Sequence, residues 1–204
     1  MFTSSQIEEL KADLKNNMSE KRFIHTLGVY ETSQFLASSI LDCGIDIALA
    51  AALLHDISKE YPISKQLEIL ETNGFPLDSD DYLSPAVFHS YTAPFVINST
   101  FPQFAVEDVL SAVRNHTIGS PDMSLIDEIV FLADFIEPTR EYSSSIDVRD
   151  YVYSSMGKNR LENQKILHKA SVMAIDFTIQ HLIENRKPIN YKNILTRNAL
   201  LSKI

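Results

Sequence analysis

The sequence predicts an all-α protein, and three observations support this prediction. The chain of 204 residues contains only 5 Gly and 8 Pro, which are too few turn formers for many short strands. Apolar residues recur at three-to-four spacing in several long stretches, as they do on one face of an α-helix. No convincing stretch alternates apolar and polar residues in the manner of a half-buried strand.

Local signals set the expected helix boundaries in the first half of the chain. Ser4 or Ser5 is expected to cap the first helix, Ser19 to begin the second, and Gly44 to end it. The polar segment 78–84 is expected to be a loop. The expected helices cover residues 4–17, 20–41, 45–57, 64–73 and 85–95. The helix over 45–57 is apolar nearly all round, which predicts that it is buried in the core.

The second half of the chain is also expected to be helical. Gly119-Ser120-Pro121 is expected to form a turn, Ser143-Ser144-Ser145 a loop, and Gly157 a break in the last long helical stretch. The expected helices cover residues 104–116, 124–136, 147–185 with that break, and 190–201. We therefore expect one all-α domain over residues 1–204, with a C-terminal helical part from about 147.

Charge and cysteine content exclude several classes of function. The formal net charge of −9 argues against general binding to nucleic acid, whose backbone is also negative. Cys43 is the only cysteine, which excludes an intrachain disulfide and a zinc–cysteine cluster. The N-terminus lacks the basic and apolar regions of a secretory signal, and the most apolar run, 45–57, is too short to span a bilayer. We expect a cytoplasmic protein that acts on neither membranes nor nucleic acids.

The adjacent pair His55-Asp56 is the most informative feature of the sequence. It follows the apolar run 48–54, where a carboxylate is costly unless it is paired or bound to a metal ion. Adjacent helical residues point about 100° apart, so both side chains can approach one ion. On its own, the pair is equally compatible with a helix end in which Asp56 binds nearby amides.

Further histidines and an aspartate favour the metal-binding interpretation. They lie in or beside apolar helical segments, at His25, His89, His116 and Asp134. Each alone is compatible with a structural role, such as a core histidine or a histidine favoured by a helix C-terminus. Together, four imidazoles and two carboxylates suit Fe, Mn, Co or Zn better than Mg or Ca. His168 and His181 lie outside this order, and we expect them to be structural or exposed.

The order of these motifs resembles the HD-domain metal-dependent phosphohydrolases, and more narrowly the YqeK-type symmetrical bis(5′-nucleosyl)-tetraphosphatases. The matching stretches lie between residues 20 and 142 and are Arg22–Val29, His55–Lys59, His89, His116–Gly119 and Leu132–Arg140. The sequence departs from the family pattern at Ser90, where Gly is usual, and at Ile118, where Thr is usual. Neither departure removes a predicted metal ligand, but both affect the expected substrate contacts.

The resemblance implies an HD-domain helical bundle with a centre of two divalent metal ions, with Fe expected and Mn, Co or Zn as alternatives. It assigns His25, His55, Asp56 and Asp134 to one metal ion. It assigns His89 and His116 to the second, with Asp56 bridging the two. A hydroxide that bridges the metal ions is the expected nucleophile. The metal-site core would then span residues of about 20 to 142.

The resemblance also implies a nucleotide substrate. The expected reaction converts diadenosine tetraphosphate and water into two ADP, and ADP or GDP would bind as product-like ligands. Lys59 is expected to act beside Asp56 in catalysis. The residues expected to contact phosphate are Lys59, Thr117, Arg140 and, less directly, Arg22. Arg22 has an alternative role as an ion-pair partner of Glu20 or Glu137. The tyrosines that can either stack on a base or belong to the core are Tyr30, Tyr61, Tyr82 and Tyr91.

Two alternatives remain open at the level of sequence. One is another HD-type nucleotide phosphohydrolase, either a 5′-nucleotidase or a nucleoside triphosphate hydrolase, with the same metal ions and a different substrate. The other is a non-catalytic nucleotide-binding regulatory module, which the full set of predicted ligands disfavours. The oligomeric state is also open, with a homodimer as one expectation.

Overall fold

The computed structural model describes all residues, 1–204, and consists of helices joined by short connections. It contains no β-strand, which confirms the all-α prediction. None of its helices combines the length and apolar character that crossing a membrane requires. The α-helices are α1 (Ser4–Asn17), α2 (Glu20–Ile40), α3 (Ile45–Leu54), α4 (Ile63–Thr72), α5 (Ser79–Leu83), α6 (Phe88–Thr100), α7 (Glu107–Asn115), α8 (Leu125–Ile136), α9 (Ser143–Ser155), α10 (Arg160–Glu184) and α11 (Tyr191–Leu201). Two short 3₁₀ helices, η1 (Pro85–Val87) and η2 (Pro102–Phe104), precede α6 and α7.

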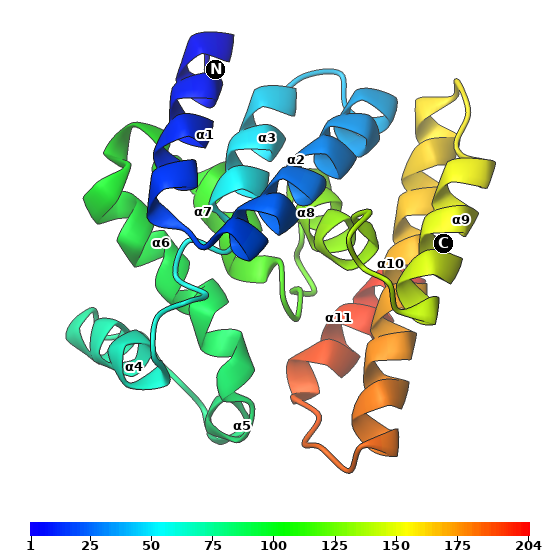
Figure 1. The fold of residues 1–204 in the computed structure, drawn as a ribbon. Coiled ribbons are helices and arrows are strands. Elements are labelled where there is room, and N and C mark those ends of the chain that lie inside the picture. The colour runs from blue at the N-terminus through cyan, green and yellow to red at the C-terminus, as the bar shows by residue number, and fades with distance from the viewer.

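Four helices form the centre of the molecule. Helix α2 packs against α3 and α8, and α7 packs against α3, α6 and α8. Figure 1 shows α1 and α6 on one side of this group and α9, α10 and α11 on the other. The fold is therefore a helical bundle in which α3 also contacts α1 on one side and α8 contacts α9 and α10 on the other.

Helix α3 connects the two main parts of the hydrophobic core. Ala48 and Ala52 belong to the cluster of buried residues that also includes residues of α2, α8, α9 and α10. Ala50, Leu53 and Leu54 of the same helix belong to a second cluster, which also includes residues of α1, α6 and α7. Residues 48–54 are all buried, as predicted from their apolar character. Because most of these side chains are alanines, neighbouring helices can approach α3 closely from several directions.

Helix ends in the first half of the chain differ from the sequence-based expectation in three places. Thr3, not Ser4 or Ser5, caps α1, because its hydroxyl accepts from the Gln6 backbone N–H while the Gln6 side chain accepts from the Thr3 N–H. Helix α2 ends at Ile40, and Gly44 instead precedes α3 with a φ of +81°, a conformation that favours glycine. Helix α3 ends at Leu54, three residues before the expected Ile57, so His55 and Asp56 lie in the turn that follows it.

Two segments expected to be loops are helical. Residues Ser79–Leu83 form α5 because Asp78 and Asp81 make a reciprocal capping box. Ser143–Ser145 forms the first turn of α9. The expected helix 104–116 is also divided, since Phe104 ends η2 and α7 begins only at Glu107. The expected helix 85–95 begins as η1 and continues as α6 to Thr100, five residues beyond its expected end. The other expected helices are present with small shifts at their ends.

Candidate metal centre

The six predicted metal ligands come from five different places in the fold and converge at one point. His25 lies on α2, and His55 and Asp56 follow the end of α3. His89 lies in the first turn of α6, His116 directly follows α7, and Asp134 lies in the last turn of α8. The donor atoms of His25, His55 and Asp134 lie within 4.8 Å of one another, as do those of His55, Asp56 and His116.

The histidine rings are fixed with one nitrogen free for a ligand. The Nδ1 atoms of His55, His89 and His116 each lie 2.7 Å from a backbone carbonyl oxygen three residues earlier in the chain. A carbonyl only accepts hydrogen bonds, so each Nδ1 carries the proton and Nε2 carries the lone pair in the neutral ring. The sequence folds this way because each histidine lies at a helix end or in a first turn, where the carbonyl three residues earlier is within reach.

Asp56 lies between two pairs of histidines. Its Oδ2 atom is 3.6 Å from His25 Nε2 and 3.5 Å from His55 Nε2. Its Oδ1 atom is 3.2 Å from His89 Nε2 and 3.6 Å from His116 Nε2. The two oxygens of one carboxylate therefore face different imidazole pairs, which is the arrangement that a bridging ligand requires.

Local electrostatics keep both aspartates ionised. Burial alone would raise the pKa of the Asp56 carboxyl, but the imidazoles of His55, His116 and His89 hold it well below its usual range. Burial opposes ionisation of Asp134 in the same way, and Arg140 and His25 hold its pKa well below the usual range. Both side chains are therefore anionic at neutral pH and ready to bind a cation.

The histidines differ in their protonation. Burial lowers the pKa of His89 to about 4, so this ring is neutral at pH 7. Burial also acts to lower the pKa of His25, but its hydrogen bonds to Asp134 and Glu137 outweigh burial and raise this pKa to about 9. His25 Nε2 lies 3.1 Å from Asp134 Oδ1. A metal ion that binds here must displace the proton of His25.

The residues present fit a centre for transition-metal ions. Four imidazole nitrogens and two ionised carboxylates form the donor set, without a thiol, because the only cysteine, Cys43, is exposed elsewhere. Such a set suits Fe, Mn, Co or Zn. The fixed Nδ1 hydrogen bonds supply the second layer of contacts that orients metal-binding histidines in proteins.

Cationic and hydroxyl side chains surround this cluster. Lys59 Nζ lies 3.1 Å from His89 Nε2, and burial lowers the pKa of this lysine. Thr117 Oγ1 lies 3.1 Å from Nε2 of both His89 and His116. All four residues predicted to bind phosphate are therefore near the cluster, because Arg22 and Arg140 contact its two aspartates.

Arg22 and Arg140 retain unused donors. Arg22 pairs with Asp56 rather than with Glu20 or Glu137, and its buried Nε has no hydrogen-bond partner. Arg140 binds the Asp134 carboxylate through Nη2 at 2.6 Å and the Asp134 backbone oxygen through Nε at 3.0 Å. Each guanidinium thus contacts one aspartate of the cluster and has donors left for another acceptor.

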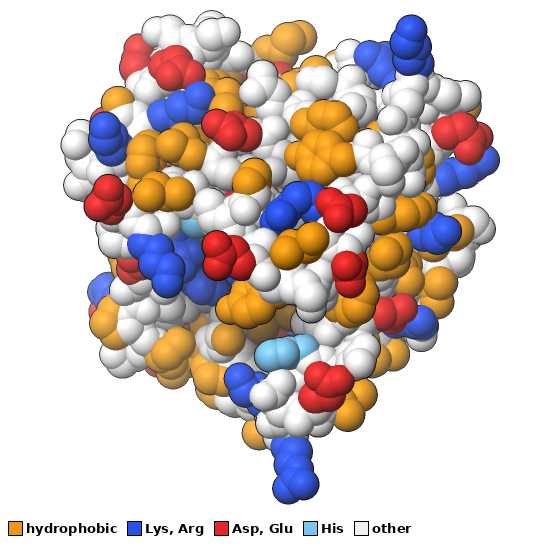
Figure 2. Space-filling model, turned by 45° about the vertical axis from the view of Figure 1, so that its right-hand side comes forward, with side chains coloured by type: hydrophobic (Ala, Val, Ile, Leu, Met, Phe, Trp, Pro, Cys, Tyr) orange, Lys and Arg blue, Asp and Glu red, His pale blue; other side chains and the backbone are white.

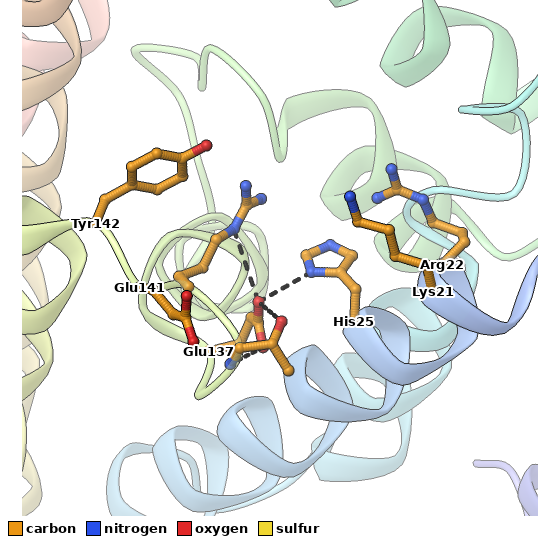
Figure 3. A pocket seen from close by; sticks show the side chains of 8 residues that line it. Lys21, Arg22, His25, Glu137, Glu141 and Tyr142 are labelled. Atoms are coloured by element: carbon orange, nitrogen blue, oxygen red, sulfur yellow. Dashed lines mark hydrogen bonds and ion pairs between the residues drawn. The ribbon is translucent and has the colours of Figure 1, made fainter.

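A polar cavity of about 490 Å³ opens beside His25. Figure 3 shows Lys21 and Arg22 on one side of this cavity and Glu141 and Tyr142 on the other. Three cationic side chains, Lys21, Arg22 and Arg140, line it and outnumber its two carboxylates, Glu137 and Glu141. We call this cavity the cationic cavity. Its charge and its position next to His25 make it suitable for an anionic ligand.

Three residues that shape the site were not predicted to do so. Glu137 is fully buried and accepts from His25 Nδ1, 3.1 Å away, and from the Thr139 N–H. Lys21 lines the cationic cavity, as its position next to Arg22 in the sequence could have suggested. Arg149 on α9 donates to the backbone oxygens of Ile136, Glu137 and Arg140. It thereby holds the connection that carries Glu137 and Arg140.

The proposed base-stacking tyrosines lie away from the cationic cavity. None of Tyr30, Tyr61, Tyr82 and Tyr91 lines it. Tyr91 is buried and hydrogen-bonded to Asp81, and Lys11 lies over the ring of Tyr30. The tyrosine that does line the cavity is Tyr142, whose position just after the last motif gave no signal of this role.

Comparisons with known proteins agree with this geometry. Residues 22–139 match the model of the HD domain family, a range that includes all six residues of the cluster. A solved structure from Clostridium acetobutylicum, described as a predicted HD superfamily hydrolase involved in NAD metabolism, is 30% identical and superimposes with a TM-score of 0.81. The similarity covers 100% of both chains.

Curated relatives share nearly the whole length of the chain. A symmetrical bis(5′-nucleosyl)-tetraphosphatase from Bacillus subtilis is 29% identical over 96% of this chain and 97% of its own. A protein of the same name from Halalkalibacterium halodurans is 30% identical over 92% of this chain and 93% of its own. The chain belongs to the HD-domain family and, within it, to the group that contains the symmetrical bis(5′-nucleosyl)-tetraphosphatases.

Proposed function

We propose that this enzyme cleaves dinucleoside tetraphosphates symmetrically, converting diadenosine tetraphosphate and water into two ADP. The observation that carries the proposal is the position of Asp56 between two imidazole pairs, directly beside the cationic cavity. Relatives that match over more than nine-tenths of the chain bear the name of this activity.

The six-residue cluster would hold two divalent metal ions, with Fe expected and Mn, Co or Zn as alternatives. His25, His55 and Asp134 would hold one ion, His89 and His116 the other, and Asp56 both. When bound, the ions supply positive charge for the polyphosphate and lower the pKa of a bridging water, so that hydroxide is available as a nucleophile at neutral pH.

The cations of the chain itself would bind the phosphates on both sides of the cluster. Lys59 and Thr117 border the pair His89 and His116, where they would neutralise and hydrogen-bond phosphate oxygens. Arg22 now neutralises Asp56. A metal ion at Asp56 would take over that counter-charge and allow Arg22 to contact the phosphate chain.

On the other side, Arg140 and Lys21 line the cationic cavity. Arg140 is held by Asp134 through Nε and Nη2, so its remaining donors are oriented before the substrate arrives. A guanidinium is suited to paired phosphate oxygens, and a lysine acts there as a point charge. A chain of several phosphates can therefore be neutralised although the protein as a whole is acidic, with a net charge of −9.

The proposal is tested by product analysis of anaerobically purified protein with measured metal content. A panel of dinucleoside polyphosphates, nucleoside triphosphates and nucleoside monophosphates is incubated with it, and products are separated by chromatography. ADP alone from diadenosine tetraphosphate is the expected result. AMP plus ATP would contradict symmetrical cleavage, and turnover restricted to mononucleotides would support another HD-type nucleotide hydrolase instead.

Asp56→Ala provides the matching test of the site. We expect loss of metal binding and of activity, because the variant removes the one carboxylate that faces both histidine pairs. Asp122→Ala, which removes an exposed carboxylate, serves as the control and should retain both properties. Normal metal content and turnover in Asp56→Ala would contradict the proposed centre.

A further inference from the structure

A second cavity of about 320 Å³ adjoins the cationic cavity and differs from it in chemistry. Its lining includes the aromatic rings of Phe135, Tyr142 and Phe177, together with hydroxyl and imidazole groups. Arg140 and Tyr142 line both cavities. We call this second cavity the aromatic cavity. Its size lies at the lower end of the range for small-molecule sites.

The aromatic cavity lies between α8, the start of α9, and α10. Phe135 and Asp134 belong to the last turn of α8, and Phe177 to α10. Figure 2 shows this side of the molecule, where a hollow containing hydrophobic side chains opens next to a histidine. Phe135 and Phe177 are half-buried, so ring surface remains available to a ligand.

Polar groups surround these rings. Ser144, Thr178 and His181 line the same cavity. His181 is exposed, as expected from the sequence, and lies near the end of α10. Flat apolar surfaces with a few hydrogen-bonding groups at the margin match the chemistry of a nucleobase, which has an apolar face and polar edges.

The position of the aromatic cavity relative to the metal centre matches the shape of a nucleotide. Asp134 of the predicted metal centre lines the aromatic cavity, and Arg140 lies between the two cavities. A nucleotide that placed phosphates at Arg140 and the metal centre would have its nucleoside next to them, because the two parts are covalently joined. Tyr142, 70% exposed at the boundary of the two cavities, has the freedom to cover a bound base.

We propose that the aromatic cavity is the subsite for one nucleoside of the substrate, with the base against Phe177 and its polar edge toward Thr178 and His181. This inference rests on the proposed function for the presence of a nucleotide. It adds a place for the base, which neither the metal cluster nor the cationic cavity provides.

The test compares ligands with and without a base. Binding of ADP and of inorganic pyrophosphate to the metal-loaded protein is measured by titration calorimetry for the parent, Phe177→Ala and His181→Ala. We expect Phe177→Ala to weaken ADP binding roughly tenfold, the scale of one stacking contact, and His181→Ala to weaken it by a smaller factor. Pyrophosphate binding should not change in either variant.

Tyr82→Ala is the matched control, because Tyr82 is an exposed tyrosine outside both cavities. Its ADP affinity should equal that of the parent. Unchanged ADP affinity in Phe177→Ala would overturn the subsite, and so would an equal loss of ADP and pyrophosphate binding in this variant.

The failure of this inference is distinguishable from the failure of the proposed function. If the parent cleaves diadenosine tetraphosphate to ADP but Phe177→Ala retains its ADP affinity, only the subsite is wrong. If the parent fails to cleave that substrate but ADP binding depends on Phe177 and pyrophosphate binding does not, the subsite stands and the reaction is different.

Discussion

Glu137 is the residue that fixes His25 in place. The carboxylate accepts from His25 Nδ1 and from both the N–H and the hydroxyl of Thr139. A carboxylate in this position keeps the proton on Nδ1, leaves Nε2 for a metal ion and raises the basicity of the ring. Glu137 is thus a positioning residue, because it would act on the metal ion through His25.

We expect Glu137→Gln to weaken metal binding about tenfold, at the lower end of the effect of losing such a partner. The amide oxygen can still accept from His25 Nδ1, so the ring stays oriented, while the charge and the hydrogen bond from the Thr139 N–H to the second oxygen are lost. Metal affinity is measured by competition with a chelator of known affinity. The control is Glu141→Gln, an exposed carboxylate at the same cavity, which should not change this affinity. Equal affinities in Glu137→Gln and the parent would contradict the role of Glu137.

Gly28 leaves the space that Glu137 occupies. A Cβ atom at position 28 would lie 2.4 Å from Glu137 Oε2, too close for any contact. Helix propensity alone would make Gly28→Ala stabilising by about 1 kcal/mol. We expect the steric effect to dominate at the site, so that Gly28→Ala displaces the carboxylate and weakens metal binding as Glu137→Gln does.

The same chelator competition measures the effect of Gly28→Ala, with Gly157→Ala as the control. An added Cβ at position 157 has no neighbour within 4 Å, so metal affinity should be unchanged there. A Gly28→Ala variant with the metal affinity of the parent would contradict the prediction, because Glu137 would then have moved without any effect on His25.

The residues of the metal cluster could be predicted from the sequence, whereas other residues near it could not, and the difference has a physical reason. The histidines and aspartates of the cluster stood out because polar side chains in apolar helices are unusual. Glu137 was visible only as part of a motif, since its role depends on meeting His25, which is 112 positions away. Phe177 and His181 lie on α10 outside all the motifs, and only the packing of α10 against α8 brings them to the aromatic cavity.

At the scale of elements, the connection between α8 and α9 carries much of the site. Arg149 Nε donates to the Ile136 oxygen at 2.6 Å, and its Nη2 donates to the oxygens of Glu137 and Arg140. These carbonyls belong to the end of α8 and the segment after it, where the helix leaves them without partners. One guanidinium thus fixes the backbone at both Glu137 and Arg140.

We expect Arg149→Lys to lower the free energy of unfolding by about 2 kcal/mol, because an ammonium cannot reproduce the three contacts of the guanidinium. It should also lower kcat/KM, since Arg140 and Glu137 lose their fixed backbone. Thermal unfolding and steady-state kinetics measure both effects. Arg160→Lys, which alters an exposed pair with Asp42, should change neither appreciably. An Arg149→Lys variant with the stability of the parent would contradict this account of the connection.

Some helix ends could be predicted from the sequence and others could not. Ser19 and Ser124 were predicted to begin helices and do cap them, because capping depends on residues only three positions away. The start of α9 was missed because Tyr142 offers no side-chain cap and Arg149 stabilises this region through tertiary contacts. The early end of α3 matters most, since it places His55 and Asp56 in a turn where both reach the centre.

At the scale of the whole molecule, buried polar contacts join segments far apart in the chain. Lys192 Nζ on α11 lies 2.7 Å from each carboxylate oxygen of the fully buried Asp81 on α5. Asn190 and Tyr91 donate hydrogen bonds to the same carboxylate. The centre itself joins α2, α6, α8 and the turns after α3 and α7. The elements around the site are therefore linked by polar groups that are costly to bury without partners.

Metal removal should for this reason destabilise the whole chain. A ligand that binds only the folded state raises the free energy of unfolding by about 2.7 kcal/mol when its concentration is a hundredfold above its Kd. Two ions at that excess would contribute about 5 kcal/mol, and a chain of this size shifts its Tm by about 2–4 °C per kcal/mol. We expect chelation to lower the Tm by about 10–20 °C, and added Fe²⁺ or Mn²⁺ to restore it, as measured by circular dichroism.

Asp56→Ala separates this linkage from a general effect of the chelator. The variant lacks the carboxylate that faces both histidine pairs, so its Tm should not respond to chelator or metal. The parent, by contrast, should show a Tm that rises with metal concentration, because binding to the folded state alone shifts the unfolding equilibrium by mass action. A parent Tm that is independent of metal concentration would mean that the cluster binds no ion tightly, which would contradict the proposed metal centre.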